Sequence, residues 1–397
     1  MTGRKYRRWH ERKRYRRFMR KQMRQMRRKP RDPKCNRTHN RKYKTRRRIS
    51  IKKVMSSFTL RQDEKVVAHF LNKTDERYLR KSHRGGLVIV LPEVFDLEEN
   101  YNHSALVFQV FRRALLEKQR IANIDFRKMK SISPACIVTF ASYVKLWKEM
   151  QKGKPYPRFS TWQTRIHDNF TQMGVFQAMD MEDSDNESQK EVESPFRYME
   201  LQSFEVVENG LDVARCRIAS LIGEIETFIK QPIGRTYFYQ SVTEAILNIY
   251  HHAYTYTHYS SKRKKWWISV GFDVRSNRLH ILVLDHGDGI PKTLMHSKTK
   301  IFMDFLTRFP LISKKSDADK LRVAFELGAK RAKTVGRGHG LSDILCYLES
   351  REQSSLVAWS GKGRYSGVHY KGKRIHGEVV SLEYRFKGTL LEWRIQL

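Results

Sequence analysis

A strongly basic segment at the start of the chain limits where a folded core can form. Residues 1–54 contain 26 Lys and Arg side chains but only two acidic ones, Glu11 and Asp32. Because this many like charges cannot be buried together, the arm is expected to be disordered, or helical with its charges in water. The composition becomes that of a globular chain from about Gly85. Because one domain takes roughly 100 to 200 residues, we expect two folded domains after the arm.

The composition of the arm leaves several roles open. Aromatic and Met side chains recur among its charges at spacings near three or four, which favours a helix ending before Pro30. Cations release counterions from phosphates and aromatic rings stack on bases, so residues 1–53 are expected to contact nucleic acid, RNA or DNA. A solvated tail, a helix adhering to a membrane surface or a ribosome, and an organelle transit segment are the alternatives, because charge attracts without specificity.

The remaining composition indicates the environment of the protein. The four cysteines have no spacing typical of a zinc site or a disulfide framework, which favours a reducing compartment. No apolar run approaches the roughly 20 residues that span a bilayer, and the N-terminus lacks the apolar core of a secretory signal. We therefore expect a soluble, cytoplasmic protein without a membrane partner.

Strand-like and helical patterns alternate over residues 85–179 and predict a small α/β domain. Short buried strands are expected in GGLVIVLPEVF and IANIDFRKM. Helices are expected in HSALVFQVFRRALLEKQR and SPACIVTFASYVKLWKEMQKG, and a final short helix in NFTQMGVFQAM. The acidic, polar stretch DMEDSDNESQKEVES at residues 180–194 is expected to be a linker.

The pattern over residues 195–397 predicts a two-layer α+β sandwich, with helices packed on one sheet. A strand in FRYMELQSFEV comes before two helices, in DVARCRIASLIGEIETFIK and YFYQSVTEAILNIYHHAYTY. WWISVGFDV and RLHILVLDHG then form strands joined by a hairpin turn at residues 275–277, with Trp266 and Trp267 in the core. LVAWSGKGRYS, GEVVSLEYRFKG and TLLEWRIQL are three further expected strands.

Two short motifs in this segment combine carboxylates with an amide, a histidine or glycines. Glu244, Asn248 and His252 are four residues apart and form one polar stripe on a helix, where a carboxylate beside an amide can orient water near Mg²⁺. Asp285 ends a strand and can accept a hydrogen bond from the exocyclic amine of adenine, while Gly287 and Gly289 let a ring approach the backbone. A solvent-facing helix surface and a plain turn are the alternatives.

The third motif is the glycine stretch at residues 336–340, ahead of the helical run SDILCYLES. Gly336, Gly338 and Gly340 place bare backbone N–H groups at a helix N-terminus, which is a ready anion site. Arg337 and His339 can add charge and donors to phosphate oxygens. The spacing is neither that of a dinucleotide-binding fingerprint nor that of a P-loop.

In this order, ExxxNxxxH, DxGxGIP and GxGxGL resemble the N box and two glycine boxes of the GHKL ATPases, the superfamily of gyrase-type topoisomerases, MutL and histidine kinases. The resemblance covers most of residues 200–397 and implies a Bergerat fold that binds ATP and Mg²⁺. It implies that Glu244 is the general base, that Asn248 binds magnesium, and that Asp285 contacts adenine in a pocket shaped by Gly287 and Gly289. The glycine stretch would hold the phosphates.

Two further segments take roles from the same resemblance. Residues 292–335 would be the ATP lid, and the stretches SDADK and AKRAK within it suit a mobile loop. FKGTLLEW resembles the family's Gly-Thr strand, which makes Thr389 a candidate contact behind the adenine.

The first domain also resembles a known family. NIDFRKMKSISPACIVTF is similar to the strand-to-helix turn of STAS domains, the anti-sigma factor antagonists, in which a serine after an aspartate is phosphorylated by an anti-sigma kinase of this ATPase class. Here Ser133 stands in place of the aspartate and Pro134-Ala135 in place of the serines, so phosphorylation of this domain is not expected.

These features lead to one expected function and two alternatives. We expect an ATPase that acts as a nucleotide-dependent regulatory switch and contacts a protein partner through the STAS-like domain. The resemblance also allows a homodimer, because hydrolysis in the GHKL superfamily is often coupled to dimerisation. A serine/threonine protein kinase of the anti-sigma factor type, acting on a separate protein, would use the same pocket. A non-catalytic nucleic-acid-binding adaptor would use the arm.

Overall fold

The computed structural model shows an α+β fold, as the sequence predicts. Its described residues are 78–81, 87–116, 121–150, 163–178, 196–207, 210–256, 264–295, 315–331, 343–370 and 373–397. All of them belong to one compact unit, Phe70–Leu397. The basic arm and the linker predicted at residues 180–194 lie outside the described residues. Within the described part of the chain, no helix is long and apolar enough to cross a membrane.

An antiparallel sheet forms the centre of the C-terminal half. Its strands run in the order β10-β11-β9-β8-β6, and β7 also pairs with β8. The bounds are Phe196–Tyr198 for β6, Gln202–Glu205 for β7, Lys265–Asp273 for β8, Arg278–Asp285 for β9, Gln353–Tyr370 for β10 and Lys373–Gln396 for β11. The predicted β8–β9 hairpin turn is confirmed, and Asn277 adopts a φ of 48° there.

The last two expected strands are one strand in the structure. β11 continues from GEVVSLEYRFKG into TLLEWRIQL, although Gly388 between them has a φ of 80°. Register shifts between β10 and β11 around Ser360 and Gly361 absorb this local irregularity, so pairing continues on both sides of it. The glycine that suggested a break therefore marks a bulge.

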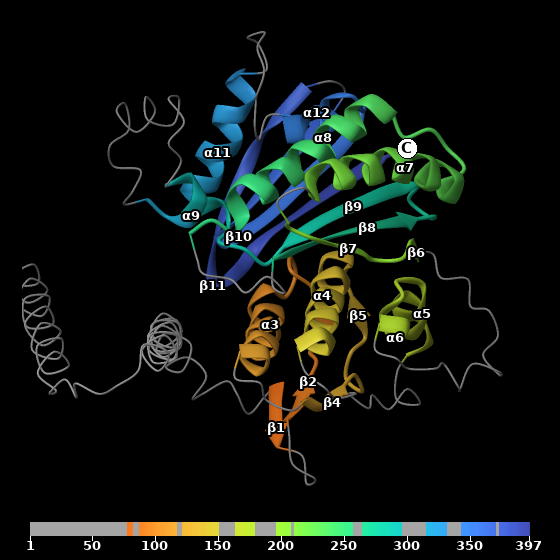
Figure 1. Cartoon of the computed structure of the whole chain (residues 1–397), viewed down its shortest axis with the longest axis vertical. Coiled ribbons are helices and arrows are strands. Elements are labelled where there is room, and N and C mark those ends of the chain that lie inside the picture. The colour runs from red at the N-terminus through yellow and green to blue at the C-terminus, as the bar shows by residue number, and fades with distance from the viewer. Residues whose placement is uncertain are drawn as a thin grey trace, which may run out of the picture. The chain divides into compact units, whose positions relative to one another are not determined.

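Helices α7, α8, α11 and α12 cover one face of the sheet (Figure 1). They span Gly210–Ile229, Arg235–Asn248, Asp317–Arg331 and Asp343–Glu349. Alternate residues of β8, from Trp266 to Phe272, join the apolar core beneath these helices. This is the predicted second layer.

Helix α11 corrects the expectation that SDADK and AKRAK belong to a mobile loop, because it contains most of the first stretch and the start of the second. Ser316 and Asp319 cap the helix start, because the Asp319 N–H donates to Ser316 Oγ at 3.1 Å and Ser316 Oγ donates to Asp319 Oδ2 at 2.7 Å. Phe325 is buried and stacks on Tyr365 of β10 with ring centroids 4.2 Å apart. The polar composition thus reflects a helix cap and a solvent-facing side.

The N-terminal half forms the predicted alternation of strands and helices. β1 (Leu79–Lys81), β2 (Leu87–Val90) and β4 (Ile121–Asp125) make one sheet, and β3 (Val94–Phe95) pairs with β5 (Ser131–Ile132). The helices are α3 (Tyr101–Leu116), α4 (Pro134–Met150), α5 (Thr164–Gln172) and α6 (Val175–Ala178). Ser133 caps α4, because its Oγ accepts the Cys136 N–H at 3.4 Å, and Pro134 occupies the first helical position.

Helices α3 and α4 cover the second face of the large sheet, which the sequence left open (Figure 1). The residues of β8 and β10 that point away from the first layer include Trp267 and Trp359, and both are fully buried. Trp359 Nε1 donates to the Leu97 carbonyl oxygen at 3.3 Å, and Tyr101 Oη donates to the Tyr384 carbonyl oxygen at 2.9 Å. The central strands β8 and β9 are therefore buried on both faces.

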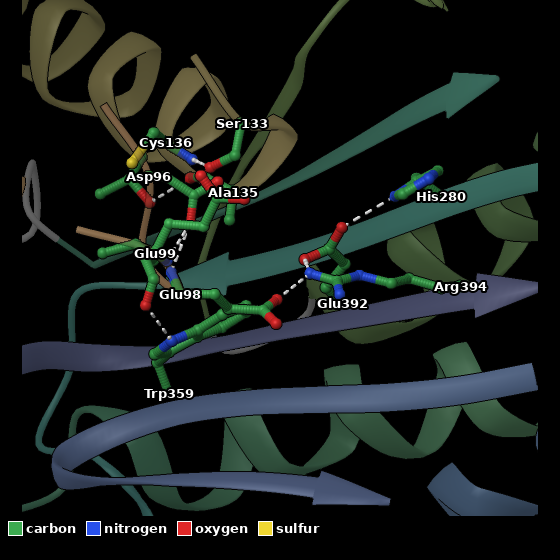
Figure 2. Close-up of polar contacts among 12 residues, drawn as sticks. Asp96, Glu98, Glu99, Ser133, Ala135, Cys136, His280, Trp359, Glu392 and Arg394 are labelled. Atoms are coloured by element: carbon green, nitrogen blue, oxygen red, sulfur yellow. Dashed lines mark hydrogen bonds and ion pairs between the residues drawn. The ribbon is translucent and has the colours of Figure 1, made fainter. Parts of the chain in front are cut away.

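A charged cluster also fixes this interface (Figure 2). Glu392 of β11 is fully buried, with Oε1 2.8 Å from His280 Nδ1 and Oε2 2.8 Å from Arg394. Arg394 also pairs with Glu98, which precedes α3. Burial alone would raise the pKa of Glu392, but Arg394 and His280 more than offset it and hold the pKa at about 2. The carboxylate therefore stays ionised inside the protein.

Candidate functional site

The first predicted motif lies on α8 and on the turn that follows it. Asn248 Nδ2 donates to the Glu244 carbonyl oxygen at 2.9 Å and to Glu244 Oε1 at 3.3 Å, so the predicted pairing of these two side chains is confirmed. Because the amide nitrogen is committed to Glu244, the amide oxygen of Asn248 is the atom that could bind a cation. Both side chains are half-buried, which suits groups that act on a ligand rather than on the core.

A π-helical turn, Ile249–Ala253, continues α8 directly after Asn248. Such turns occur often at functional sites, because they redirect backbone carbonyls. Here the Ala253 carbonyl oxygen accepts the Asp288 N–H at 2.6 Å. His252 lies in this turn, half-buried, and its pKa is lowered by burial and by the neighbouring His251. Of the predicted stripe, the structure thus pairs Glu244 with Asn248 and places His252 in the turn beyond them.

The second motif forms a tight loop, residues 285–289, between β9 and the short helix α9 (Ile290–Leu294). The Asp285 side chain is buried and its Oδ1 accepts the Gly287 N–H at 2.7 Å. Burial raises the pKa of Asp285 to about 7, although the hydrogen bond from Gly287 and the charge of Lys387 oppose the increase. A carboxyl that is buried and yet close to ionisation is typical of a ligand-binding position.

The glycines near this loop are required by close backbone approaches. A Cβ atom on Gly287 would lie 2.1 Å from the Ala253 carbonyl oxygen, and one on Gly388 would lie 1.9 Å from the Asp285 carbonyl oxygen. Gly289 has a φ of 84°, in the left-handed region that favours glycine. The sequence predicted an open pocket from these glycines, and the structure shows that Gly287 also lets the loop pack against the end of α8.

Thr389 lies beside Asp285, because the two residues are direct partners in the β9–β11 pairing. Thr389 Oγ1 is 3.1 Å from Ser360 Oγ, which also accepts the Ile290 N–H at 2.9 Å. Ser360 therefore joins the end of the loop to the Gly-Thr strand. Sequence reasoning missed Ser360, although a serine inside the apolar strand LVAWSG is a signal for a buried polar contact.

Asp288 was also missed, and it holds the loop from within. Its fully buried side chain accepts the Tyr256 N–H at 2.9 Å and pairs with Lys292 Nζ at 2.7 Å. The loop and the end of α8 are thus connected through both backbone and side chains. The alternation of acid and glycine in DHGDG gave a signal that both aspartates have roles.

Helix α12, which follows the third motif in the chain, lies beside α8. The Tyr347 N–H donates to Ser241 Oγ at 3.0 Å, and Arg351, just after the helix, donates to the Pro232 carbonyl oxygen at 3.5 Å. Helix α12 therefore runs antiparallel to α8, with its N-terminal end towards Asn248. Residues 336–340, with Gly336, Arg337, Gly338, His339 and Gly340, lie outside the described residues, so their role stays a prediction.

Two other observations delimit the site. Among the described residues, no cluster of three or more His, Cys, Asp and Glu side chains could hold a metal ion, so a magnesium ion here would depend on Asn248 and on oxygens of a ligand. A cavity of about 650 Å³ lies elsewhere, at the end of β2, lined in part by Tyr78, Glu93 and His103. None of the predicted site residues lines it.

No protein-family model matches this chain, and no curated protein matches it.

Proposed function

We propose that residues 195–397 form a GHKL-type ATP-binding domain with the Bergerat fold, and that the chain is a Mg-ATP-dependent ATPase that acts as a regulatory switch. One observation supports this most. Asn248 pairs with Glu244, the π turn directly after Asn248 is hydrogen-bonded to the Asp285 loop, and Thr389 is the β-sheet partner of Asp285. Helix α12 points its N-terminal end towards Asn248. The resemblance assigns the base, the cation ligand and the adenine contacts to these residues, and it places the phosphate-binding segment in the chain ahead of α12.

The residues suit the chemistry of phosphoanhydride hydrolysis. Glu244 would accept a proton from a water molecule, and its contact with Asn248 fixes the carboxylate next to the proposed cation ligand. The Asn248 amide oxygen would hold Mg²⁺ together with phosphate oxygens, and the ion would supply charge neutralisation for the phosphates. Asp285 would accept a hydrogen bond from the exocyclic amine of adenine.

The N-terminal half, with its STAS-like turn, would be the part that responds to the nucleotide. Its helices α3 and α4 pack directly on β8, β9 and β11, and β9 and β11 carry the candidate adenine contacts. A change at the loop can therefore reach a surface presented to a protein partner without a separate hinge. This arrangement favours a switch over an enzyme whose product is its only output.

The experiment that tests the proposal follows the terminal phosphate. Purified protein is incubated with Mg-ATP labelled at that position, and free phosphate and protein-bound label are measured for wild type and for Glu244→Gln. The matched control is Glu349→Gln, an exposed glutamate on α12. We expect free phosphate from wild type and from the control, and at least a hundredfold less from Glu244→Gln, because general-base catalysis contributes about 10²- to 10⁴-fold.

Other outcomes would redirect the proposal. Label transferred to protein, with little free phosphate, would favour a protein kinase of the anti-sigma factor type. Binding of ATP without release or transfer, with candidate partners added, would leave a non-catalytic adaptor. A further variant tests the cation site: Asn248→Ala should remove the magnesium dependence of ATP binding, whereas the Glu349→Gln control should keep it.

A further inference from the structure

We propose that Ser142 of α4 is a positioning residue for base recognition: it holds His286, and through it the Asp285 carboxylate, in the geometry that selects adenine. This inference rests on the proposed nucleotide site. It assigns to the N-terminal half a direct part in binding, and it concerns the base rather than the phosphates. His286 carries the argument, because it lies between Asp285 and Gly287 in the loop.

The side chain of His286 points into α4 and not towards solvent. Ser142 is fully buried, and its Oγ lies 2.7 Å from the Thr139 carbonyl oxygen and 2.8 Å from His286 Nε2. The single hydroxyl hydrogen goes either to Thr139, with His286 donating its Nε2–H to Ser142, or to His286 Nε2 itself. In both cases the hydrogen bond ties the imidazole to α4.

Aromatic rings hold the same imidazole from two sides. Tyr143 of α4 stacks on it, with ring centroids 4.4 Å apart, and Trp267 of β8 meets it edge-on at 4.9 Å. His286 is 7% exposed. Its position is thus set by contacts from two elements, of which α4 supplies both the hydrogen bond and the stacked ring.

The backbone of the loop is fixed on its other side by the end of α8. The His286 N–H donates to Tyr254 Oη at 3.2 Å, and the Asp288 N–H donates to the Ala253 carbonyl oxygen at 2.6 Å. The loop is therefore held between α4 and the π turn. Removing the hydrogen bond from α4 would leave the α8 side intact and let the Asp285 side of the loop shift, so base recognition should change more than phosphate binding or turnover.

The test compares Ser142→Ala with Ser269→Ala in the full-length protein. Ser269 is a buried serine on β8 in the part of the sheet that α4 covers, but it is outside the loop. Kd values for ATP and GTP are measured with Mg²⁺, together with kcat for ATP. We expect Ser142→Ala to raise the Kd for ATP about five- to tenfold, as loss of one buried hydrogen bond allows, with the Kd for GTP and kcat within about twofold. Ser269→Ala should leave the ratio of the Kd for GTP to the Kd for ATP (the ATP/GTP ratio) unchanged.

A spectroscopic measurement accompanies the binding data. In nucleotide-free wild type, ¹⁵N NMR of the histidine rings should show His286 as a neutral imidazole in a single tautomer, and Ser142→Ala should change that signal alone. Tyr143→Leu, which removes the stacked ring, should lower the ATP/GTP preference in the same direction, and it provides a second test if Ser142→Ala folds poorly.

The outcomes separate this inference from the proposed function. If wild type binds ATP and Ser142→Ala keeps the wild-type ATP/GTP ratio, the positioning role is refuted and the nucleotide site stands. Equal weakening of ATP and GTP would mean that Ser142 only stabilises the fold, which also refutes the role. If wild type binds neither nucleotide, the proposed function itself fails.

Discussion

Asp285 and His286 are adjacent buried groups whose pKa values shift in opposite directions, and this leads to a test of the loop that needs no ligand. Burial raises the pKa of Asp285 from 3.8 to about 7. Burial, with the charges of Lys387 and Arg112, lowers the pKa of His286 from 6.5 to about 3. Between about pH 4 and pH 6.5 the folded protein therefore carries a proton on Asp285 and none on His286, and the unfolded chain has the reverse.

The two shifts have opposite effects on stability. The free energy of unfolding rises with pH when the unfolded state binds more protons, as for His286, and falls with pH when the folded state binds more, as for Asp285. One proton corresponds to about 1.4 kcal/mol per pH unit, so in wild type the two contributions nearly cancel in this window. The free energy of unfolding of Asp285→Asn, minus that of wild type, should therefore rise by about 1.4 kcal/mol per pH unit from pH 4.5 to 6. The same difference for His286→Gln should fall by as much.

Urea denaturation at pH 4.5, 5.2 and 6.0, followed by tryptophan fluorescence, measures these differences. The control is Asp212→Asn, at the start of α7, because that side chain is 88% exposed in the folded protein and should give a difference that does not vary with pH. Slopes of opposite sign for the two variants are the expected result. If the difference between His286→Gln and wild type is constant over this range, the imidazole is not buried in its neutral form and the description of the loop is wrong.

Three further predictions concern packing, charge and the arm. Gly287→Ala should lower the free energy of unfolding by about 2 kcal/mol or more, because its Cβ would meet a backbone carbonyl oxygen at 2.1 Å. Gly223→Ala, in open space on α7, should raise the free energy of unfolding by about 0.5 to 1 kcal/mol. Urea denaturation checks both. Arg394→Met should lower the free energy of unfolding by about 3 to 5 kcal/mol, because it leaves Glu392 buried without its main partner. Adding Glu392→Leu should recover most of that loss. An Arg394→Met variant as stable as wild type would contradict this prediction. Deletion of residues 1–53 should weaken RNA or DNA binding and flatten its salt dependence, and an unchanged salt slope would exclude the arm as the binding segment.

Most of the local structure could be predicted from the sequence. Apolar periodicity located the helices and strands, and the β8–β9 hairpin followed from turn residues. Spacing on a helix correctly brought Glu244 to Asn248, and the burial of Trp266 and Trp267 is confirmed. These features depend on residues close in the chain, so a sequence pattern is sufficient to reveal them.

The features that were missed depend on residues far apart in the chain. Ser142 and His286 are separated by 144 positions, and no local pattern marks a serine on an apolar helix as a partner for a histidine in a loop. The start of α11 was misjudged because the residues that cap a helix are the same polar types that favour loops. The π turn after Asn248 is hydrogen-bonded to the loop through the Ala253 carbonyl oxygen, and local composition does not encode a contact between such distant residues.

The double cover of the large sheet has a consequence for how this protein can vary. Trp267 and Trp359 are kept from water by helices encoded more than a hundred residues earlier, and Glu98 meets Arg394 across 296 positions. A gene fragment encoding only the second half would leave an apolar face bare, and its product would be prone to aggregate. The two halves must therefore be inherited together, and a substitution at Glu98 or Arg394 in a relative should be accompanied by a change at the other position.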